Sequence, residues 1–151
     1  MGDVKHVDAE VLVSLISRGV VPVMAPLTHD GEGNMLNTNA DTIAGETAKA
    51  LAEAFDVTLI YCFEKKGVLR DAEDEDSVIP VITPDLFKKY VDEGVIQGGM
   101  IPKLENSFSA VEAGVSQVVI TLASAIDGKS GTIIKNNSKK GSGRLLNFSN
   151  P

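Results

Sequence analysis

Residues 57–63, VTLIYCF, are the stretch that decides which fold we expect of this chain. The run contains no charged side chain and is rich in apolar and aromatic residues. Such a run favours a strand, and the lack of polar alternation is typical of a parallel strand that helices bury on both faces. Cys62, the only cysteine of the chain, lies within it, so we expect a buried free thiol and a reducing compartment.

Outward from this strand, the sequence alternates between strand-like and helix-like segments. Three more runs predict strands: 20–25 (VVPVMA), 117–122 (QVVITL) and 131–135 (GTIIK). Helical spacing of apolar residues predicts four helices, over 8–18, from 41 to 55, over 84–91 after a Thr83 cap, and over 102–113. This alternation predicts an α/β layered domain with a mostly parallel sheet.

The remaining segments are predicted to be loops or tail. Residues 28–35 (THDGEGNM) are rich in turn formers, and 70–76 (RDAEDED) is a charge run that indicates a solvated loop. Residues 136–151 shift to Asn, Ser, Gly and Lys, which predicts a disordered tail behind an ordered domain of residues 1–135.

Composition excludes several classes of function. The net charge of −7, with no basic block interleaved with aromatics, argues against a nucleic-acid partner. No apolar run approaches the roughly 18–20 residues that span a bilayer, and no secretion signal is recognisable, so we expect a cytoplasmic protein without a membrane partner. His6 and His29 lack the spacing of a zinc site, and we expect no protein-held metal.

In open α/β sheets, ligands bind beyond the carboxyl ends of the strands, where helices begin. One such junction is residues 36–45, LNTNADTIAG, which place Asn37, Asn39 and Asp41 around a helix N-terminus. Free backbone N–H groups there favour an anion. One of the three polar residues would suffice to cap the helix, so capping and ligand binding both remain open.

A second junction follows residues 57–63 and has the sequence EKKGVLR, residues 64–70. Gly67 permits a turn in this stretch. Its polar groups could line a nucleotide or face water, and the residue types alone favour water.

The third junction is residues 94–107, GVIQGGMIPKLENS. Gly98 and Gly99 would let the backbone approach a ligand, and we expect Pro102 to start the helix with Lys103 at its second position. A cation is locally unfavourable at a helix N-terminus, which already has about half a positive charge. Either Lys103 is a surface lysine, or lysine, helix end and glycines converge on a phosphate.

Taken in order, four segments resemble the acetylglutamate kinase family of the amino acid kinase superfamily. The segments are GDVKHVDAEVLVSLISRGVVPVMAPL, LNTNADTIAG, KKGVLRD and GVIQGGMIPKLENSFSAVEAGV. The resemblance runs from residue 2 to about residue 135. It implies an α/β/α sandwich of which this chain is the C-terminal, nucleotide-binding half. It also implies ATP-dependent phosphorylation of the side-chain carboxylate of N-acyl-L-glutamate in arginine biosynthesis.

The same resemblance implies roles for individual residues. Lys103 would stabilise the transferring phosphoryl group, Asp41 would organise the catalytic lysines, and Asn37 would contact the acylated amino acid, with Asn39 beside it. ATP would bring Mg²⁺ with it. The expected cofactor-binding residues are Glu64, Lys65, Lys66, Gly67, Val68, Leu69, Val95, Ile96, Gln97, Gly99 and Met100.

Two departures from the family accompany these expectations. The family's opening segment, with a strand, a lysine, a Gly-Gly loop and an arginine, has no counterpart here, so we expect no activity from this half alone. Phe63 and Glu64 stand where the family usually has Thr or Ser followed by Asp. The alternative is a non-catalytic nucleotide-binding or interaction module derived from such a kinase. A homo-oligomer is compatible with either hypothesis, since an unpaired sheet edge promotes self-association.

Overall fold

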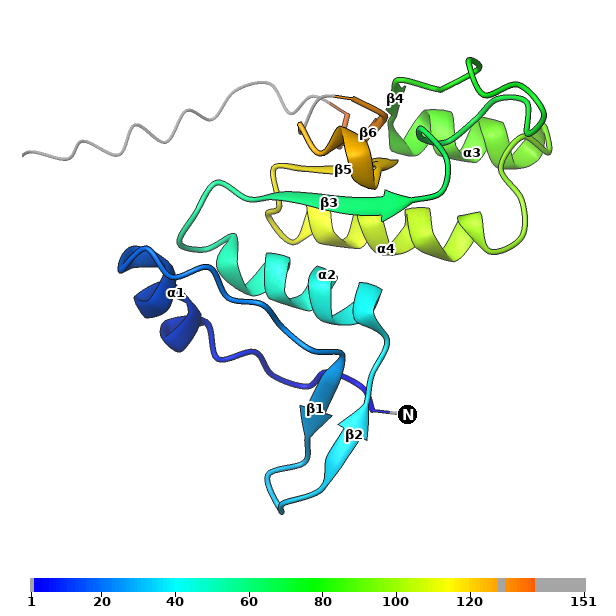
Figure 1. Ribbon diagram of the computed structural model, residues 1–151. Helices are drawn as coiled ribbons and strands as arrows, with labels where there is room; N and C mark the ends of the chain where they lie inside the picture. The colour runs from blue at the N-terminus through cyan, green and yellow to red at the C-terminus, as the bar shows by residue number, and fades with distance from the viewer. Residues whose placement is uncertain (1, 128–129, 138–151) are drawn as a thin grey trace, which may run out of the picture.

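The computed structural model describes residues 2–127 and 130–137 (Figure 1). Its helices in these ranges are α1 (Ala9–Ser17), α2 (Ala40–Leu51), α3 (Pro84–Asp92) and α4 (Met100–Glu112), with a short 3-10 turn at Ala123–Ala125. Its strands are β1 (Leu27–His29), β2 (Met35–Asn37), β3 (Thr58–Phe63), β4 (Val81–Ile82), β5 (Gln117–Leu122) and β6 (Thr132–Ile134). Most of the predicted tail, residues 138–151, lies outside the described residues.

The main sheet has four strands in the order β3-β5-β6-β4. β3 runs parallel to β5 in a register that begins with Thr58 opposite Gln117 and ends with Phe63 opposite Leu122. β4 is parallel to β6, while β5 and β6 are antiparallel. The sheet is therefore mainly parallel and the class is α/β, as the sequence predicts.

Helices α2 and α4 lie side by side along the sheet, with α2 next to β3 and α4 next to β5 (Figure 1). The apolar face of α4 contributes Leu104, Phe108 and Val111 to the core, and Leu104 is fully buried. Val118 and Ile120 of β5 are also at most 1% exposed. Burial of these branched side chains between helix and strand is the main force that holds the two layers together.

β3 differs from the expectation of a strand buried on both faces. Leu59 and Tyr61 are buried, but Thr58 and Cys62, which point to the other side, are exposed. The prediction of a buried thiol at Cys62 is therefore wrong. The reason is position in the sheet: β3 is an edge strand, and the described helices cover only the Leu59 side of it.

Residues 20–25 do not form the predicted strand. They are extended but have no strand partner in the described part of the chain, and Val21 and Val23 are 83% and 94% exposed. β-branched residues favour a strand only where a neighbouring strand accepts the backbone hydrogen bonds. Pro22 has no N–H to donate to such a neighbour.

Residues 28–35 are not simply a loop, because β1 and β2 pair as an antiparallel hairpin through them. The turn of the hairpin lies at residues 30–34, within the stretch that is rich in turn-forming residues. Asp30 accepts hydrogen bonds from the backbone N–H groups of Glu32 and Asn34 at 2.8 and 3.2 Å, and from the Asn34 side chain at 2.6 Å. The Asn34 side-chain bond is the main reason that the pKa of Asp30 is lowered. The flanking strands are three residues each, too short to show alternation.

Three helices have a side-chain cap, of which the sequence analysis predicts Thr83 and leaves Asn39 open. Asp8, Asn39 and Thr83 occupy the N-caps of α1, α2 and α3, and each side chain accepts a hydrogen bond from a backbone N–H of the first turn. α4 is different, because it begins at Met100 rather than at Pro102 and has Gly99 as its cap. Gly98, with φ of +55°, makes the sharp turn that allows this earlier start.

Thr132 of β6 holds the loop after β3 in place through two hydrogen bonds. The Thr132 hydroxyl accepts from the N–H of Val68 at 2.8 Å and donates to the carbonyl of Ile79 at 2.7 Å. Thr132 is fully buried. A Cβ on Gly67 would lie 2.7 Å from this hydroxyl, so only glycine allows the loop to come this close.

We expect Thr132→Val to lower the free energy of unfolding by about 1–3 kcal/mol, because it leaves a buried N–H and a buried carbonyl without partners at nearly constant shape. Urea unfolding followed by circular dichroism measures the change. Thr132→Ser keeps the hydroxyl and is the control for the two hydrogen bonds. A valine variant as stable as the unmodified chain would contradict the role assigned to this hydroxyl.

Candidate functional site

Three elements bring charged and aromatic groups together at the carboxyl end of β3. Lys103 comes from the first turns of α4, Asp41 from the first turn of α2, and Phe63 is the last residue of β3. The Lys103 ammonium lies 3.5 Å from Asp41 Oδ2 and 3.9 Å from the centroid of the Phe63 ring. The Lys103 and Asp41 side chains are 39% and 45% exposed, so an incoming ligand can reach both.

Tyr61 ties the start of α2 to the same strand. Its hydroxyl donates to the backbone carbonyl of Asp41 at 3.2 Å. Burial, and then the Asp41 and Glu46 carboxylates, raise the pKa of Tyr61 to about 12. The phenol therefore remains a neutral donor at physiological pH, and the backbone of Asp41 is held against β3.

Lys103 is the fourth residue of α4, not the second, because the helix begins at Met100. The repulsion expected between a cation and the helix N-terminus is smaller at this depth, since the dipole effect falls off within the first turn. The Asp41 carboxylate offsets what remains. Ser107 donates to the Lys103 carbonyl at 2.8 Å one turn further on.

A cavity of about 620 Å³ lies beside the start of α4. It is formed by the loop after β3, the turn between α3 and α4, and the first residue of α4. The residues that line it are Lys65, Gly67, Val68, Leu69, Arg70, Asp71, Ala72, Gly94, Val95, Ile96, Gln97 and Met100. Two loops far apart in sequence thus share one cavity.

Most of the residues expected to bind the cofactor line this cavity, and three do not: Glu64, Lys66 and Gly99. Lys66 instead donates to Asp76 in the acidic loop at 2.9 Å. That hydrogen bond is the main reason that the pKa of Lys66 is raised and that of Asp76 is lowered. The acidic loop therefore has a local role in pairing with Lys66.

Arg70 is a cavity residue that the sequence reasoning did not select. Its Nη2 donates to the hydroxyl of Tyr90 at 3.1 Å, and its guanidinium lies 5.3 Å from the centre of that ring. Tyr90 is buried in α3. Arg70 is therefore a fixed positive charge at the cavity, and only its position within EKKGVLR pointed to it in the sequence.

The two asparagines of the first junction have different surroundings. Asn39 caps α2 by accepting from the N–H of Thr42 at 3.1 Å, which is the local role that the sequence left open. Asn37 is the last residue of β2 and lies opposite Leu27 in the hairpin. Both side chains are exposed, and the hairpin rather than the main sheet positions Asn37.

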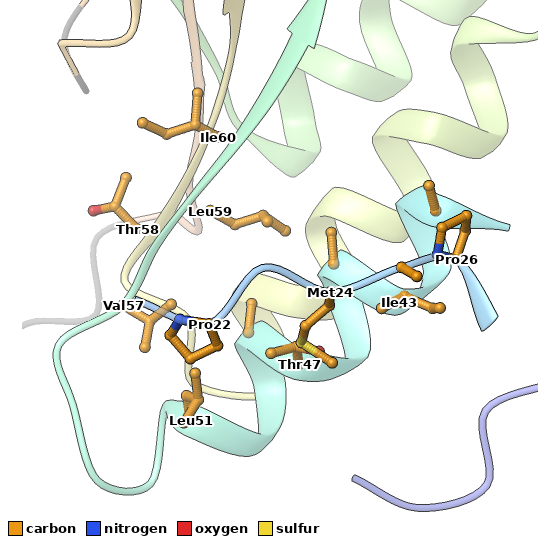
Figure 2. A pocket seen from close by; sticks show the side chains of 14 residues that line it. Pro22, Met24, Pro26, Ile43, Thr47, Leu51, Val57, Thr58, Leu59 and Ile60 are labelled. Carbon is orange, nitrogen blue, oxygen red and sulfur yellow. The ribbon is translucent and has the colours of Figure 1, made fainter. Parts of the chain in front are cut away.

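A separate cavity of about 360 Å³ lies between residues 22–26, α2 and the start of β3 (Figure 2). None of its lining residues is charged, and it includes none of the predicted site residues. Figure 2 shows Leu59 pointing toward α2 while Thr58 and Ile60 point to the opposite side of the strand. This cavity is a gap in apolar packing and offers no group for acid–base or phosphoryl chemistry.

We expect Asn39→Ala to lower the free energy of unfolding by about 1 kcal/mol through loss of the cap, with Asn39→Asp close to the unmodified chain. Thermal and urea unfolding measure both variants. Asn37→Ala is the matched control, because the N–H of Thr42 is not bonded to it. If Asn39→Ala and Asn37→Ala have the same small effect, Asn39 does not stabilise α2 as a cap.

The family model and the curated relatives that match this chain indicate the same family. Residues 1–122 match the model of the "Amino acid kinase family". The chain is 76% identical over 135 residues to the acetylglutamate kinase of Phocaeicola vulgatus, a match that covers 89% of this chain and 52% of that protein. The chain thus spans about half the length of the curated relatives it matches.

Solved structures agree in fold. The structure of smu.665 from Streptococcus mutans UA159 has a TM-score of 0.69 at 38% identity and covers 89% of this chain and 50% of that one. Carbamate kinase from Giardia lamblia bound to AMP-PNP has a TM-score of 0.61 at 19% identity, covering 87% and 45%. The second likeness is one of fold alone, since fold does not determine the substrate.

Proposed function

The chain belongs to the amino acid kinase family, and from this we propose that it is the nucleotide-binding part of an acetylglutamate kinase, which uses ATP to phosphorylate the side-chain carboxylate of an N-acylglutamate. The observation that supports this most directly is the position of Lys103. Met100 lines the 620 Å³ cavity, and Lys103 follows three residues later on the same helix, paired with Asp41. We propose that the phosphates of a nucleotide held in the cavity extend along α4 toward this ammonium.

The cavity suits an adenine nucleotide in size and chemistry. Ligand pockets commonly measure about 300–1,000 Å³ and combine apolar walls with a few polar groups. Val68, Val95 and Ile96 supply apolar surface for a base, and Lys65 and Arg70 supply positive charge for phosphates. Bound there, ATP supplies the phosphoryl group that is transferred.

The chemical task of the protein in such a transfer is positioning and charge compensation. A carboxylate that approaches a phosphate repels it, by about 4 kcal/mol for unit charges 4 Å apart near a protein surface. The Lys103 ammonium offsets this repulsion and the charge on the transferring oxygens. The Asp41 carboxylate restricts where that ammonium lies, so less ordering remains to be done during the reaction.

The remaining assignments concern the acceptor and the metal. We assign Asn37 and Asn39 to the acceptor; the cap uses Oδ1 of Asn39, so its amide N–H groups are the donors that suit a carboxylate. In the described residues, no group of three or more His, Cys, Asp or Glu side chains is arranged to hold a metal ion. We propose that Mg²⁺ arrives with the nucleotide.

The compartment that we propose is the cytoplasm, where ATP and amino-acid biosynthesis are found. In the described residues, no helix combines the length and apolar character needed to cross a membrane.

We expect Lys103→Ala to weaken ATP binding about tenfold or more, since a hydrogen bond to a charged group contributes about 1.5–3 kcal/mol. Isothermal titration calorimetry with the full chain measures this. Lys89→Ala is the control, because Lys89 is an exposed lysine of α3 whose partner is Glu93, the C-cap of the same helix, at 3.8 Å. If the two substitutions weaken ATP binding equally, the assignment of Lys103 to the nucleotide site is wrong.

We expect Lys65→Ala to weaken ATP binding about tenfold and Lys66→Ala by no more than about twofold. Adjacent lysines of the same loop are thereby compared: Lys65 lines the cavity, while Lys66 is paired with Asp76. Titration with ATP in low and moderate salt measures both variants, because screening weakens the contribution of exposed charges. A larger loss for Lys66→Ala would place the phosphates outside the cavity.

Hydroxamate formation tests whether this half has activity by itself. Acylglutamyl phosphate, formed from ATP and N-acetylglutamate, reacts with hydroxylamine to give a hydroxamate, which forms a coloured complex with iron(III). We expect the chain alone to bind ATP without forming hydroxamate, because it spans about half the length of its curated relatives. Hydroxamate formed by the chain alone would contradict this expected inactivity, and absence of ATP binding would contradict both the kinase assignment and the nucleotide-binding module.

A further inference from the structure

Phe63 stands where the family usually has Thr or Ser, and the resemblance assigns no role to an aromatic ring at this position. It is the last residue of β3, half-buried and packed against the core. The centroid of its ring lies 3.9 Å from the Lys103 ammonium and 6.4 Å from the centroid of the Tyr61 ring. An ammonium this close to an aromatic face is attracted by the negative potential of the ring.

Asp41 by itself is a weak restraint on Lys103. The two charges are 3.5 Å apart, and both side chains are more than a third exposed. Exposed ion pairs of this kind contribute little, because water competes for each charge and the lysine side chain has four rotatable bonds to order. A single partner also fixes the ammonium in distance but not in direction.

The Phe63 ring restrains the Lys103 ammonium from a second side. The space enclosed by Asp41, Tyr61, Phe63, Lys103 and Asn106 measures about 10 Å³, which is at the lower limit of what holds one water molecule. The ring lies against the ammonium at 3.9 Å and leaves room for at most about one water molecule on that side of the Lys103–Asp41 pair. Partial exclusion of water strengthens both contacts.

We propose that Phe63 is a positioning residue for the reaction: its ring and the Asp41 carboxylate together hold the Lys103 ammonium where the phosphoryl group is transferred. This inference rests on the proposed function for its purpose, but not for its geometry. The ring acts on Lys103 and not on the substrate. An aromatic residue at the end of β3 is what the role requires, and a serine, a threonine or an aliphatic residue there would lack the ring face.

The geometric part is tested by NMR on the full chain with ¹³C-labelled lysine. Protons above the face of an aromatic ring are shifted upfield, so we expect the terminal methylene of Lys103 to be shifted upfield relative to the other lysines. The signal is assigned by its loss in Lys103→Arg. Phe63→Leu should abolish the shift, and Phe63→Tyr should restore it. Phe55→Leu, which removes an exposed ring elsewhere, should leave it unchanged.

The functional part is tested by ATP titration of the same variants. We expect Phe63→Leu to weaken ATP binding about two- to fivefold, the equivalent of one cation–π contact, and Phe63→Tyr to bind as the unmodified chain does. Thermal unfolding verifies that each variant is folded. Leucine keeps apolar volume but has no ring, whereas tyrosine keeps the ring. Weaker binding by Phe63→Leu together with normal binding by Phe63→Tyr therefore shows that the ring itself is required.

Three results would overturn the proposal. The first is a Lys103 signal that does not move in Phe63→Leu, and the second is an upfield shift that Phe63→Tyr fails to restore. The third is unchanged ATP affinity in a Phe63→Leu variant that has lost the shift. Failure of the unmodified chain to bind ATP would instead count against the proposed function, while the NMR result would still decide whether Phe63 positions Lys103.

Discussion

The parallel pairing of β3 on β5 is the constraint on which the candidate site depends. It fixes Phe63 opposite Leu122, so both strands end at the same edge of the sheet. The helices that pack on these strands begin near that edge, which brings the first turns of α2 and α4 to the end of β3. Lys103 and Asp41 are 62 residues apart in number (103 − 41), yet their charged groups are 3.5 Å apart. No local signal in either helix could achieve this without the strand between them.

The cavity beside the site depends on a second, buried interaction. Thr132 of β6 contacts both Val68 in the loop after β3 and Ile79, two residues before β4. Because the hydroxyl is both donor and acceptor, it satisfies two backbone groups with one side chain in a place where water cannot. The absence of a side chain at Gly67 makes this approach possible. The loop is thus hydrogen-bonded to the sheet at Val68, and its polar residues on either side, Lys65 and Arg70, line the cavity.

The elements that could be predicted from the sequence are those with a local cause. Residues 117–122 and the Thr83-capped helix were placed closely because a buried apolar run and a capping side chain act within a few residues. The errors are those that depend on a distant partner. Whether residues 20–25 form a strand depends on a neighbour for their backbone, and whether Cys62 is buried depends on what covers the outer face of β3.

The same distinction applies to the candidate site. The residue types and spacings left capping and ligand binding open at Asn39, and water or nucleotide open at residues 64–70; the roles came from the family resemblance. The meeting of residues 65–72 with 94–97 in one cavity is a property of the fold. Arg70 escaped selection because its position is set by Tyr90, a residue of α3 that no pattern links to it.

The position of the Lys103 ammonium depends on the register of β3 against β5. Side chains alternate along β3, so Leu59, Tyr61 and Phe63 share the face that meets α2 and α4, while Cys62 lies on the other face. A slip of one residue against β5 would replace Phe63 by Cys62 or Glu64 at the end of this face. It would also move the Tyr61 hydroxyl from the Asp41 carbonyl. The buried contacts of Leu59 and Tyr61 make that slip unfavourable, because it would expose both side chains to water. Burial of the apolar side chains of β3 thus has two effects. It stabilises the fold, and by fixing the register it also fixes the position of the Lys103 ammonium.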